Sequence, residues 1–305
     1  MLKGIYFFLL SILTIASFAT ADCAHAAETI SIRTTTVGKF KVSVLNEKES
    51  EGDSYILVGA SSDDIKKYLP GGGYPSSTNA FLVQTPNSVI LVDTGYGTKL
   101  FENMKALGVK PEDIDAVLLT HMHGDHIGGL LREGKTTFPK AKLYVAQKES
   151  DYWTSRENMK KAPAGRRSGF EKSIETLAAY KGRIERFTPG ELTKNGTELL
   201  PGIRANAAYG HTPGHTAFMI ESEGDQLLIW GDLTHAMAIQ MPLPRVGVVY
   251  DVDLPMAIAT REAYLDFIAQ NKIPVAGMHV PMPGMGTLKK DPATQDGYIF
   301  TPTTF

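Results

Sequence analysis

The chain has 305 residues, of which 43% are hydrophobic and 21% charged, a composition typical of a folded globular protein. Its formal net charge is −2, so it lacks the strong positive field that nucleic acids or anionic lipids require, and we expect neither as a partner. The length accommodates one large domain or two modest ones.

The first 26 residues are predicted to be a signal peptide. Lys3 supplies a positive charge, residues 5–18 are apolar, and Ala24-His25-Ala26 offers small residues for cleavage. The apolar run is shorter than the ~20 residues of a spanning helix, which favours cleavage over a retained anchor. We therefore expect an exported protein, periplasmic or secreted, with no membrane attachment after cleavage and a mature domain of residues 27–305.

Cys23 is the only cysteine of the chain, and cleavage after Ala26 would remove it. The mature protein would then contain neither an intramolecular disulfide nor a thiolate. This excludes a cysteine nucleophile and a cysteine metal ligand.

Past the leader, residues 30–47 alternate apolar and polar side chains, which is typical of half-buried strands. Residues 63–79 are rich in Gly, Pro and Ser and are predicted to form a loop. A hairpin is predicted over 80–95, then a helix over 99–109 and a buried strand over 113–120. This last strand leads directly into a cluster of histidines.

The second half repeats this order of strands followed by a helix. A strand and the start of a helix are predicted over 141–153, and the polar segment of about 151–187 is predicted to be a helical excursion from the domain. Strands follow within 202–232, then an amphipathic helix over 255–271 and a strand within 274–281. Two sheets packed face to face with helices outside, a four-layer α/β arrangement, would accommodate this order.

The histidine cluster lies in the stretch "THMHGDHIGG", residues 120–129. Its possible metal ligands are His121, His123, Asp125 and His126. Strand alternation places the first two on one side, and Gly124 allows a turn that returns the other two to the same point. Residues 127–131 are predicted to begin a helix. A lone histidine is usually structural, but three imidazoles and a carboxylate at this spacing are typical of a metal site.

Three more possible ligands follow predicted strands. His211 lies in "GHTPGH", Asp232 follows "LLIWG", and His279 follows "PVAG". Together with the cluster they provide enough nitrogen and oxygen donors for two metal ions.

These motifs, in this order, resemble those of the metallo-β-lactamase superfamily over nearly the whole mature chain. The segments "DTGYGTKLF", "WGDLTHAMAIQM" and "GMHVPMPGMG" are similar to the methyl parathion hydrolase branch, a group of exported binuclear metal hydrolases. The resemblance implies an αββα sandwich, two divalent metal ions with zinc as the expected metal, and a tendency to form homodimers.

Carried over by position, the resemblance also implies the ligands of each metal. His121, His123 and His211 would hold one ion, whereas Asp125, His126 and His279 would hold the other, with Asp232 bridging the pair. Asp125 and Asp232 would also be the catalytic residues, because a hydroxide bridging the metals would attack a carbonyl or phosphoryl centre and Asp125 would orient it.

Five other residues have roles that the sequence leaves open. Asp93 either accepts a hydrogen bond from a ligand imidazole or caps a turn, and His215 is either such a partner or structural. His235 stands where similar acyl-homoserine lactonases have a substrate-binding tyrosine. Trp153 and Phe170 align with aromatic residues of the branch's pocket and would either bind substrate or anchor the excursion.

The sequence favours a hydrolase of lactones, aryl esters or phosphotriesters. No basic cluster is visible near the motifs, so we expect a small, neutral, apolar substrate. An iron-dependent oxidoreductase or dioxygenase on the same fold, and a non-catalytic metal-binding protein, remain alternatives. A β-lactam substrate is disfavoured, because no cysteine ligand is present and Asp232 occupies the bridging position.

Overall fold

The computed structural model describes Met1 and residues 31–303, and the compact unit that contains the site begins at Ser31. The predicted signal peptide and its cleavage site lie outside the described residues. Among the described helices, none combines the length and the apolar character that crossing a membrane requires.

The first sheet of this unit carries the N-terminal half of the chain. Its order is β1-β2-β4-β5-β6-β9-β10, antiparallel from β1 to β5 and parallel from β5 to β10. The strands are β1 Ile32–Val37, β2 Phe40–Asp53, β4 Gly73–Gln84, β5 Val89–Val92, β6 Ala116–Leu118, β9 Lys142–Ala146 and β10 Ile184–Phe187.

The second sheet carries the C-terminal half, in the order β11-β12-β13-β14-β16-β17-β18. Only β14 and β16 pair in parallel. The strands are β11 Thr197–Leu200, β12 Ile203–Ala207, β13 Thr216–Ser222, β14 Asp225–Ile229, β16 Val275–Ala276, β17 Met285–Lys290 and β18 Tyr298–Pro302. Two small ribbons pair β3 Leu57–Val58 with β15 Gly247–Val248, and β7 Leu131–Arg132 with β8 Lys135–Thr136.

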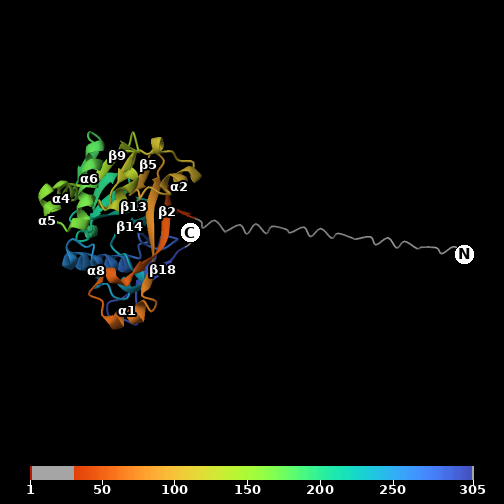
Figure 1. The fold of residues 1–305 in the computed structure, drawn as a ribbon, viewed down its shortest axis with the longest axis vertical. Coiled ribbons are helices and arrows are strands. Elements are labelled where there is room, and N and C mark those ends of the chain that lie inside the picture. Colours follow the sequence, from red (N-terminus) through yellow and green to blue (C-terminus); the bar gives the residue numbers. More distant parts are fainter. Residues whose placement is uncertain (2–30, 304–305) are drawn as a thin grey trace. The chain divides into compact units, whose positions relative to one another are not determined.

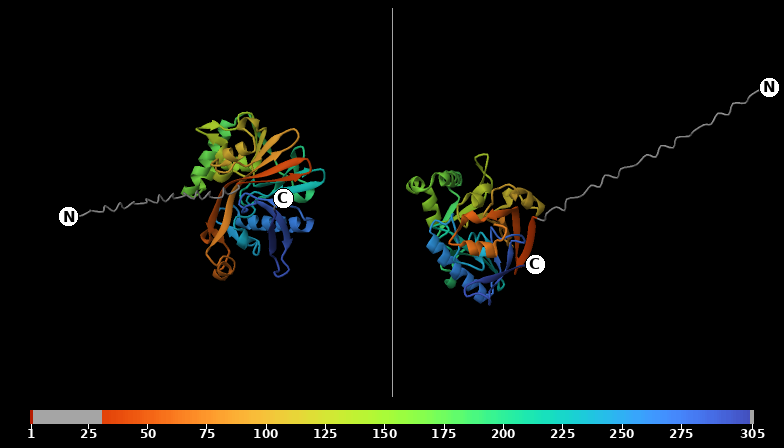
Figure 2. Two further views of the ribbon diagram at one scale, coloured as in Figure 1. Left: turned by 90° about the vertical axis from the view of Figure 1, so that its right-hand side faces the viewer. Right: turned by 60° about the horizontal axis from the view of Figure 1, so that its bottom comes forward.

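Helices cover the outer faces of both sheets (Figures 1 and 2). They are α1 Ser62–Tyr68, α2 Leu100–Ala106, α3 Gly124–Ile127, α4 Gln147–Thr154, α5 Arg156–Lys161, α6 Arg167–Ala179, α7 Met237–Gln240 and α8 Leu254–Asn271. Buried side chains between the sheets, among them Phe81 and Phe218, form one core. A second core lies between the first sheet and α2, α4 and α6, and a third lies between the second sheet and α8. The predicted four-layer α/β sandwich is confirmed.

Three local predictions differ from the structure. Residues 63–79, predicted to form a loop, contain most of α1 and the start of β4. β4 begins this early because it pairs with β2 as far as Gly73, which lies opposite Asp53. Residues 127–131 are helical as far as Leu130, but the helix starts earlier than predicted, since α3 covers Gly124–Ile127 and a 3-10 helix over Gly128–Leu130 follows it. Over 151–187 the chain forms helices as far as Ala179 but ends in β10, which pairs in parallel with β9.

The loops that follow several strands meet at one place. β5 and β6 run parallel in the first sheet, and β14 and β16 run parallel in the second. Their carboxyl ends lead to Asp93, His121, Asp232 and His279 respectively. Parallel strands direct their C-terminal loops to the same edge, which is where α/β proteins commonly bind ligands.

Candidate metal centre and its cavity

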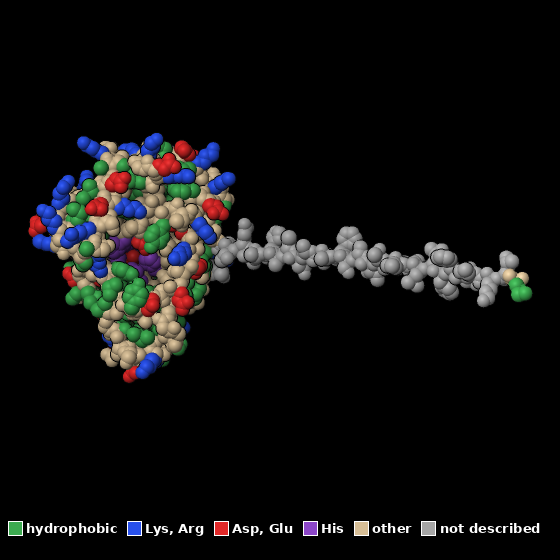
Figure 3. All heavy atoms as spheres, in the orientation of Figure 1, with side chains coloured by type: hydrophobic (Ala, Val, Ile, Leu, Met, Phe, Trp, Pro, Cys, Tyr) green, Lys and Arg blue, Asp and Glu red, His purple; other side chains and the backbone are tan. Residues whose placement is uncertain are grey.

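All seven histidines of the described residues lie around one point. Ring centroids of neighbouring members are 3.9–5.8 Å apart, and the seven are His121, His123, His126, His211, His215, His235 and His279. Figure 3 shows histidine and acidic side chains at the bottom of a hollow, with hydrophobic and basic side chains around it. The site is thus deeply set but open to solvent on one side.

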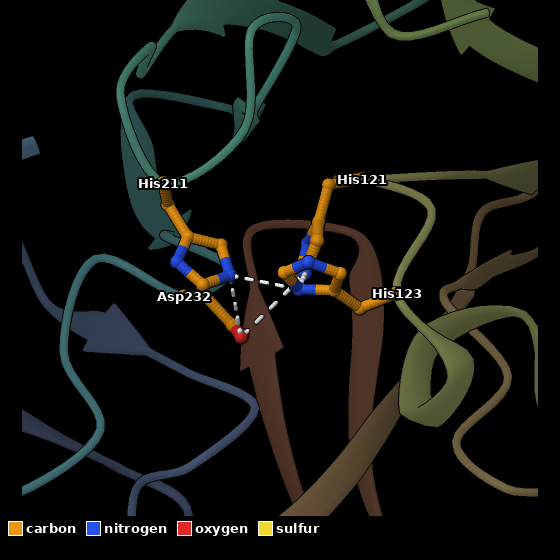
Figure 4. Close-up of side chains that lie close together, drawn as sticks. All are labelled: His121, His123, His211 and Asp232. Carbon is orange, nitrogen blue, oxygen red and sulfur yellow. Dashed lines mark hydrogen bonds and ion pairs between the residues drawn. The ribbon is translucent and has the colours of Figure 1, made fainter. Parts of the chain in front are cut away.

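The first group of donors is formed by three histidines and Asp232 (Figure 4). His123 Nδ1 lies 2.9 Å from His121 Nε2 and 3.0 Å from His211 Nε2. Asp232 Oδ2 lies 3.6 Å from His121 Nε2 and 3.4 Å from His211 Nε2. Four donor atoms therefore face one another across a space suited to a single cation.

The second group consists of Asp125, His126 and His279. His126 Nε2 lies 3.8 Å from Asp125 Oδ1, and His279 Nε2 lies 3.6 Å from Asp125 Oδ2. Asp232 is also adjacent, with Oδ1 3.2 Å from His126 Nε2 and Oδ2 3.1 Å from His279 Nε2. Asp232 thus lies between the two groups, and the structure brings together all seven ligands predicted from the sequence.

The other ring nitrogen of three of these histidines is held by an acceptor. His126 Nδ1 donates to Asp93 Oδ2 at 2.6 Å, His211 Nδ1 to Asp251 Oδ1 at 2.8 Å, and His279 Nδ1 to the Ser77 carbonyl at 2.8 Å. Because these partners accept, Nδ1 carries a proton and each Nε2 faces the shared centre, where it can bind a metal when it is not itself protonated. Metal-binding histidines in proteins are typically oriented this way.

The buried atoms of the centre without a hydrogen-bond partner include two from predicted ligands, His126 Nε2 and Asp232 Oδ1. An unsatisfied buried polar atom is costly, and a divalent cation between these atoms would satisfy both. Oriented lone pairs, two carboxylates and unsatisfied donor atoms all fit a divalent metal. The residues present therefore fit the metal pair that the sequence predicts.

The titration of the cluster follows from its burial and its charges. Burial and the neighbouring imidazoles hold the pKa of His121 and His123 well below the usual range. Burial would also lower the pKa of His279, but the Asp232 and Asp125 carboxylates outweigh it and raise this pKa to about 9. Burial would raise the pKa of Asp232, yet the surrounding histidines hold it well below its usual range.

A cavity of about 500 Å³ opens onto the centre. Asp125, Asp232 and His279 lie at its base, while the aromatic residues Trp153, Tyr96 and Tyr250 line its walls. Arg166 and Lys172 also line it, a basic pair that the sequence did not reveal near the ligand motifs. An apolar cavity with a few convergent polar groups is typical of a small-molecule site.

The three predicted substrate-binding residues lie in different surroundings. Trp153 lines this cavity, with its ring edge-on to His123 at 5.4 Å, and also belongs to the core beneath α4 and α6. Phe170 is 1% exposed and lines a neighbouring cavity of about 320 Å³, where it packs 4.6 Å from Trp153. His235 lines the main cavity, with Nε2 3.0 Å from Asp232 Oδ2 and its ring stacked on His279.

Asp93 and His215, whose roles were open, each position a part of the centre. Asp93 accepts from the Thr120 backbone N–H and hydroxyl at 2.8 and 2.6 Å as well as from His126. His215 Nδ1 donates to the Ala208 carbonyl, and its Nε2 accepts from the Asp232 backbone N–H at 3.0 Å. The first residue therefore orients a ligand imidazole, and the second fixes the loop that carries Asp232.

Sequence reasoning missed two buried carboxylates beside the centre. Asp251, at the loop before α8, orients His211, and Glu149 of α4 accepts hydrogen bonds from both histidine-bearing loops. Nothing in the sequence distinguishes Asp251 from nearby Asp253. For Glu149 the available signal was its spacing of four from Trp153, which places both on one helical face.

An αββα sandwich with this donor set defines a metal-binding protein of the hydrolase type. Residues 73–271 match the metallo-beta-lactamase superfamily, and the chain belongs to this superfamily of metal-dependent hydrolases.

Two solved structures extend the likeness over the whole domain. The chain is similar to the hydrolase AbOPH of the beta-lactamase superfamily, with a TM-score of 0.80 and 26% identity, covering 90% of this chain and 98% of that one. It is equally similar to AidC, a dizinc quorum-quenching lactonase, with a TM-score of 0.81, 25% identity and the same coverage.

Curated relatives match over shorter stretches. The uncharacterized protein YobT of Bacillus subtilis (strain 168) is 29% identical over 158 residues, 50% of this chain and 60% of that protein. An N-acyl homoserine lactonase of Bacillus cereus is 25% identical over 175 residues, 49% of this chain and 60% of that protein. The matched region thus spans less than two thirds of either relative.

Proposed function

We propose that this protein is a binuclear metal-dependent hydrolase that opens lactones or cleaves aryl esters, with phosphotriesters as a further substrate class. The observation that carries the proposal is the pair of donor groups sharing Asp232 at the base of an aromatic-walled cavity. Two adjacent metal sites with one shared carboxylate are an arrangement suited to hydrolysis.

His121, His123 and His211 would hold one divalent ion, and Asp125, His126 and His279 the other, with Asp232 contacting both. When bound, such a pair supplies Lewis-acid polarisation of the substrate and lowers the pKa of an attacking water. Zinc is the metal we propose, because imidazole-rich sites with carboxylates suit it.

The other residues of the cavity would bind and orient the substrate. Asp125, 21% exposed at its side chain, faces the cavity and can accept a proton there. The Trp153 and Tyr250 rings offer apolar walls for an acyl chain or aryl group. His235 lines the cavity in the place where similar lactonases have a tyrosine, and its Nε2 would hold Asp232 Oδ2, 3.0 Å away, beside the substrate.

The proposal ranks carbonyl substrates above phosphotriesters. Acyl substrates are supported by the likeness to a dizinc lactonase and to an N-acyl homoserine lactonase. The resemblance to the methyl parathion hydrolase branch supports phosphotriesters. Arg166 and Lys172 add a positive wall that a neutral substrate does not need, and this wall suits a carboxylate product such as the one formed when a lactone opens.

A comparison of four substrates tests the proposal. The purified protein is loaded with zinc, and kcat/KM is measured for an aryl ester, an aromatic lactone, an acyl-homoserine lactone and a dimethyl phosphotriester. We expect a lactone or the ester to exceed the phosphotriester at least tenfold. A leading phosphotriester would reverse the ranking, and a zinc-loaded protein inactive on all four would contradict the proposed substrate classes.

A further inference from the structure

Glu149 lies at the contact between α4 and the two loops that carry the first donor group. It is 1% exposed, and its carboxylate faces inward from the first turn of α4. A buried carboxylate is costly unless hydrogen bonds compensate it. The hydrogen-bond partners of Glu149 therefore show which interactions compensate the burial of its carboxylate.

The carboxylate joins two loops that are far apart in the sequence. Oε1 accepts from the Met122 backbone N–H at 2.9 Å, and Oε2 accepts from the Gly214 backbone N–H at 2.9 Å. Met122 lies between His121 and His123, whereas Gly214 lies three residues after His211. In Figure 4 these loops approach the site from opposite sides. The Glu149 side chain thus fixes the distance between the two loops that carry His121, His123 and His211.

Two further contacts make the arrangement specific. A Cβ at Gly214 would lie 2.3 Å from the Glu149 backbone nitrogen, so only glycine lets this loop reach α4. Trp153 Nε1 donates to Glu149 Oε1 at 2.7 Å, which sets the indole edge-on to His123. The same carboxylate therefore also positions one wall of the substrate cavity.

We infer that Glu149 is a positioning residue that holds the His121–His123 loop, the His211 loop and the Trp153 ring in register for metal and substrate binding. The inference rests on the proposed binuclear function. Glu149 acts through its hydrogen bonds to the backbone amides of the loops and to the Trp153 indole. Replacing it by glutamine preserves its size but substitutes an N–H₂ donor for one acceptor, so one of the N–H partners loses its bond.

Stepwise zinc release tests this inference. Zinc-loaded wild type, Glu149→Gln and Asp151→Asn are titrated with a chromophoric chelator, and zinc released per protein is recorded. Asp151 is an exposed carboxylate on the same helix, so its amide variant is the matched control. We expect Glu149→Gln to release its first zinc at a chelator concentration at least about tenfold lower, with the second unchanged. The second zinc of Glu149→Gln should leave at the same chelator concentration as the zinc that His211→Asn retains, because His211→Asn lacks a ligand of the first group.

A general loosening of the fold would lower the chelator concentration for both zinc ions equally, and that result would overturn the inference, as would release identical to wild type. If Glu149→Gln does not accumulate as a folded protein, Gly214→Ala is titrated instead, because it displaces the same loop and keeps the carboxylate. A wild type that binds no zinc would overturn the proposed function itself, so the two failures are distinguishable.

Discussion

Single residues beside the ligands set the direction of each lone pair. Asp251 holds His211 Nδ1 at 2.8 Å and is itself held by the Val248 backbone N–H at 3.0 Å. We expect Asp251→Asn to weaken zinc binding about 10- to 100-fold, as is typical when the partner of a metal-binding histidine is removed. Chelator competition measures this. Asp253→Asn is the control, because asparagine caps a helix such as α8 as well as aspartate does.

His235 is the residue whose role the sequence left most open. Its Nε2 lies 3.0 Å from Asp232 Oδ2, and burial lowers its pKa to about 4, so it is neutral near pH 7. We expect His235→Gln to lower kcat about tenfold or more, because the hydrogen bond that orients Asp232 at the base of the cavity is altered, and to keep both zinc ions. Metal analysis of the purified variant decides the matter. A protein that retains only one zinc would make His235 a ligand instead.

At the scale of elements, the loops are placed by glycines at close approaches. Gly231 precedes Asp232 with φ +62°, and a Cβ there would lie 2.4 Å from His215 Nε2. We expect Gly231→Ala to lower the free energy of unfolding by more than the roughly 1 kcal/mol that the backbone conformation alone costs. Urea unfolding of the metal-free protein measures it. Gly224→Ala provides the comparison, since Gly224 has φ +91° and open space around it; equal losses would refute the packing argument.

Elements with strong periodicity or buried apolar runs were predictable, and those fixed by distant partners were not. The hairpin of β4 and β5 and the helix α8 follow their sequence patterns. The strand at 73–79 does not, because pairing with β2 overrides a Gly/Pro-rich composition, and Pro75 is tolerated where β5 is too short to pair with it. Gly128 and Gly129 form a 3-10 helix that continues α3, and the sequence does not reveal that they pack against the backbone of Tyr96 and Thr94.

The residues of the candidate site also divide into those that the sequence predicts and those that it does not. The seven predicted ligands carry their chemistry in their residue type and follow strands, so their convergence could be inferred. Glu149, Asp251 and the Arg166–Lys172 wall are ordinary charged residues in polar segments. Their roles arise only when α4, α6 and the loop before α8 fold against the centre.

At the scale of the whole molecule, the metal-free centre makes stability depend on pH. Neighbouring carboxylates outweigh burial and raise the pKa of His279 to about 9 and that of His126 above its usual range. Because the folded protein binds these protons more tightly than the unfolded chain does, they stabilise the fold. This stabilisation is complete below pH 6.5, the pKa of histidine in the unfolded chain, and is lost as the pH rises through about 9, the pKa of His279 in the folded protein. For His279 the rise in pKa from 6.5 to about 9 corresponds to about 3 kcal/mol of the free energy of unfolding.

We therefore expect the Tm of the metal-free protein to fall between pH 6.5 and 9. The zinc-loaded protein should show no such fall, because the metal occupies the place of the protons. His121 and His123, whose pKa values are lowered, are already neutral over this interval. Calorimetry of both forms at several pH values measures the difference, and parallel curves for the two forms would contradict the explanation.

We propose that two metal ions, held by the two donor groups and sharing Asp232, make this protein a hydrolase. The most direct measurement is a titration of the metal-free protein with zinc while hydrolysis of an aryl ester or lactone is followed. We predict activity that rises from none and reaches its plateau at two zinc ions per chain, and Asp232→Ala should abolish it. Full activity in the metal-free protein, or a plateau at one zinc, would contradict the account.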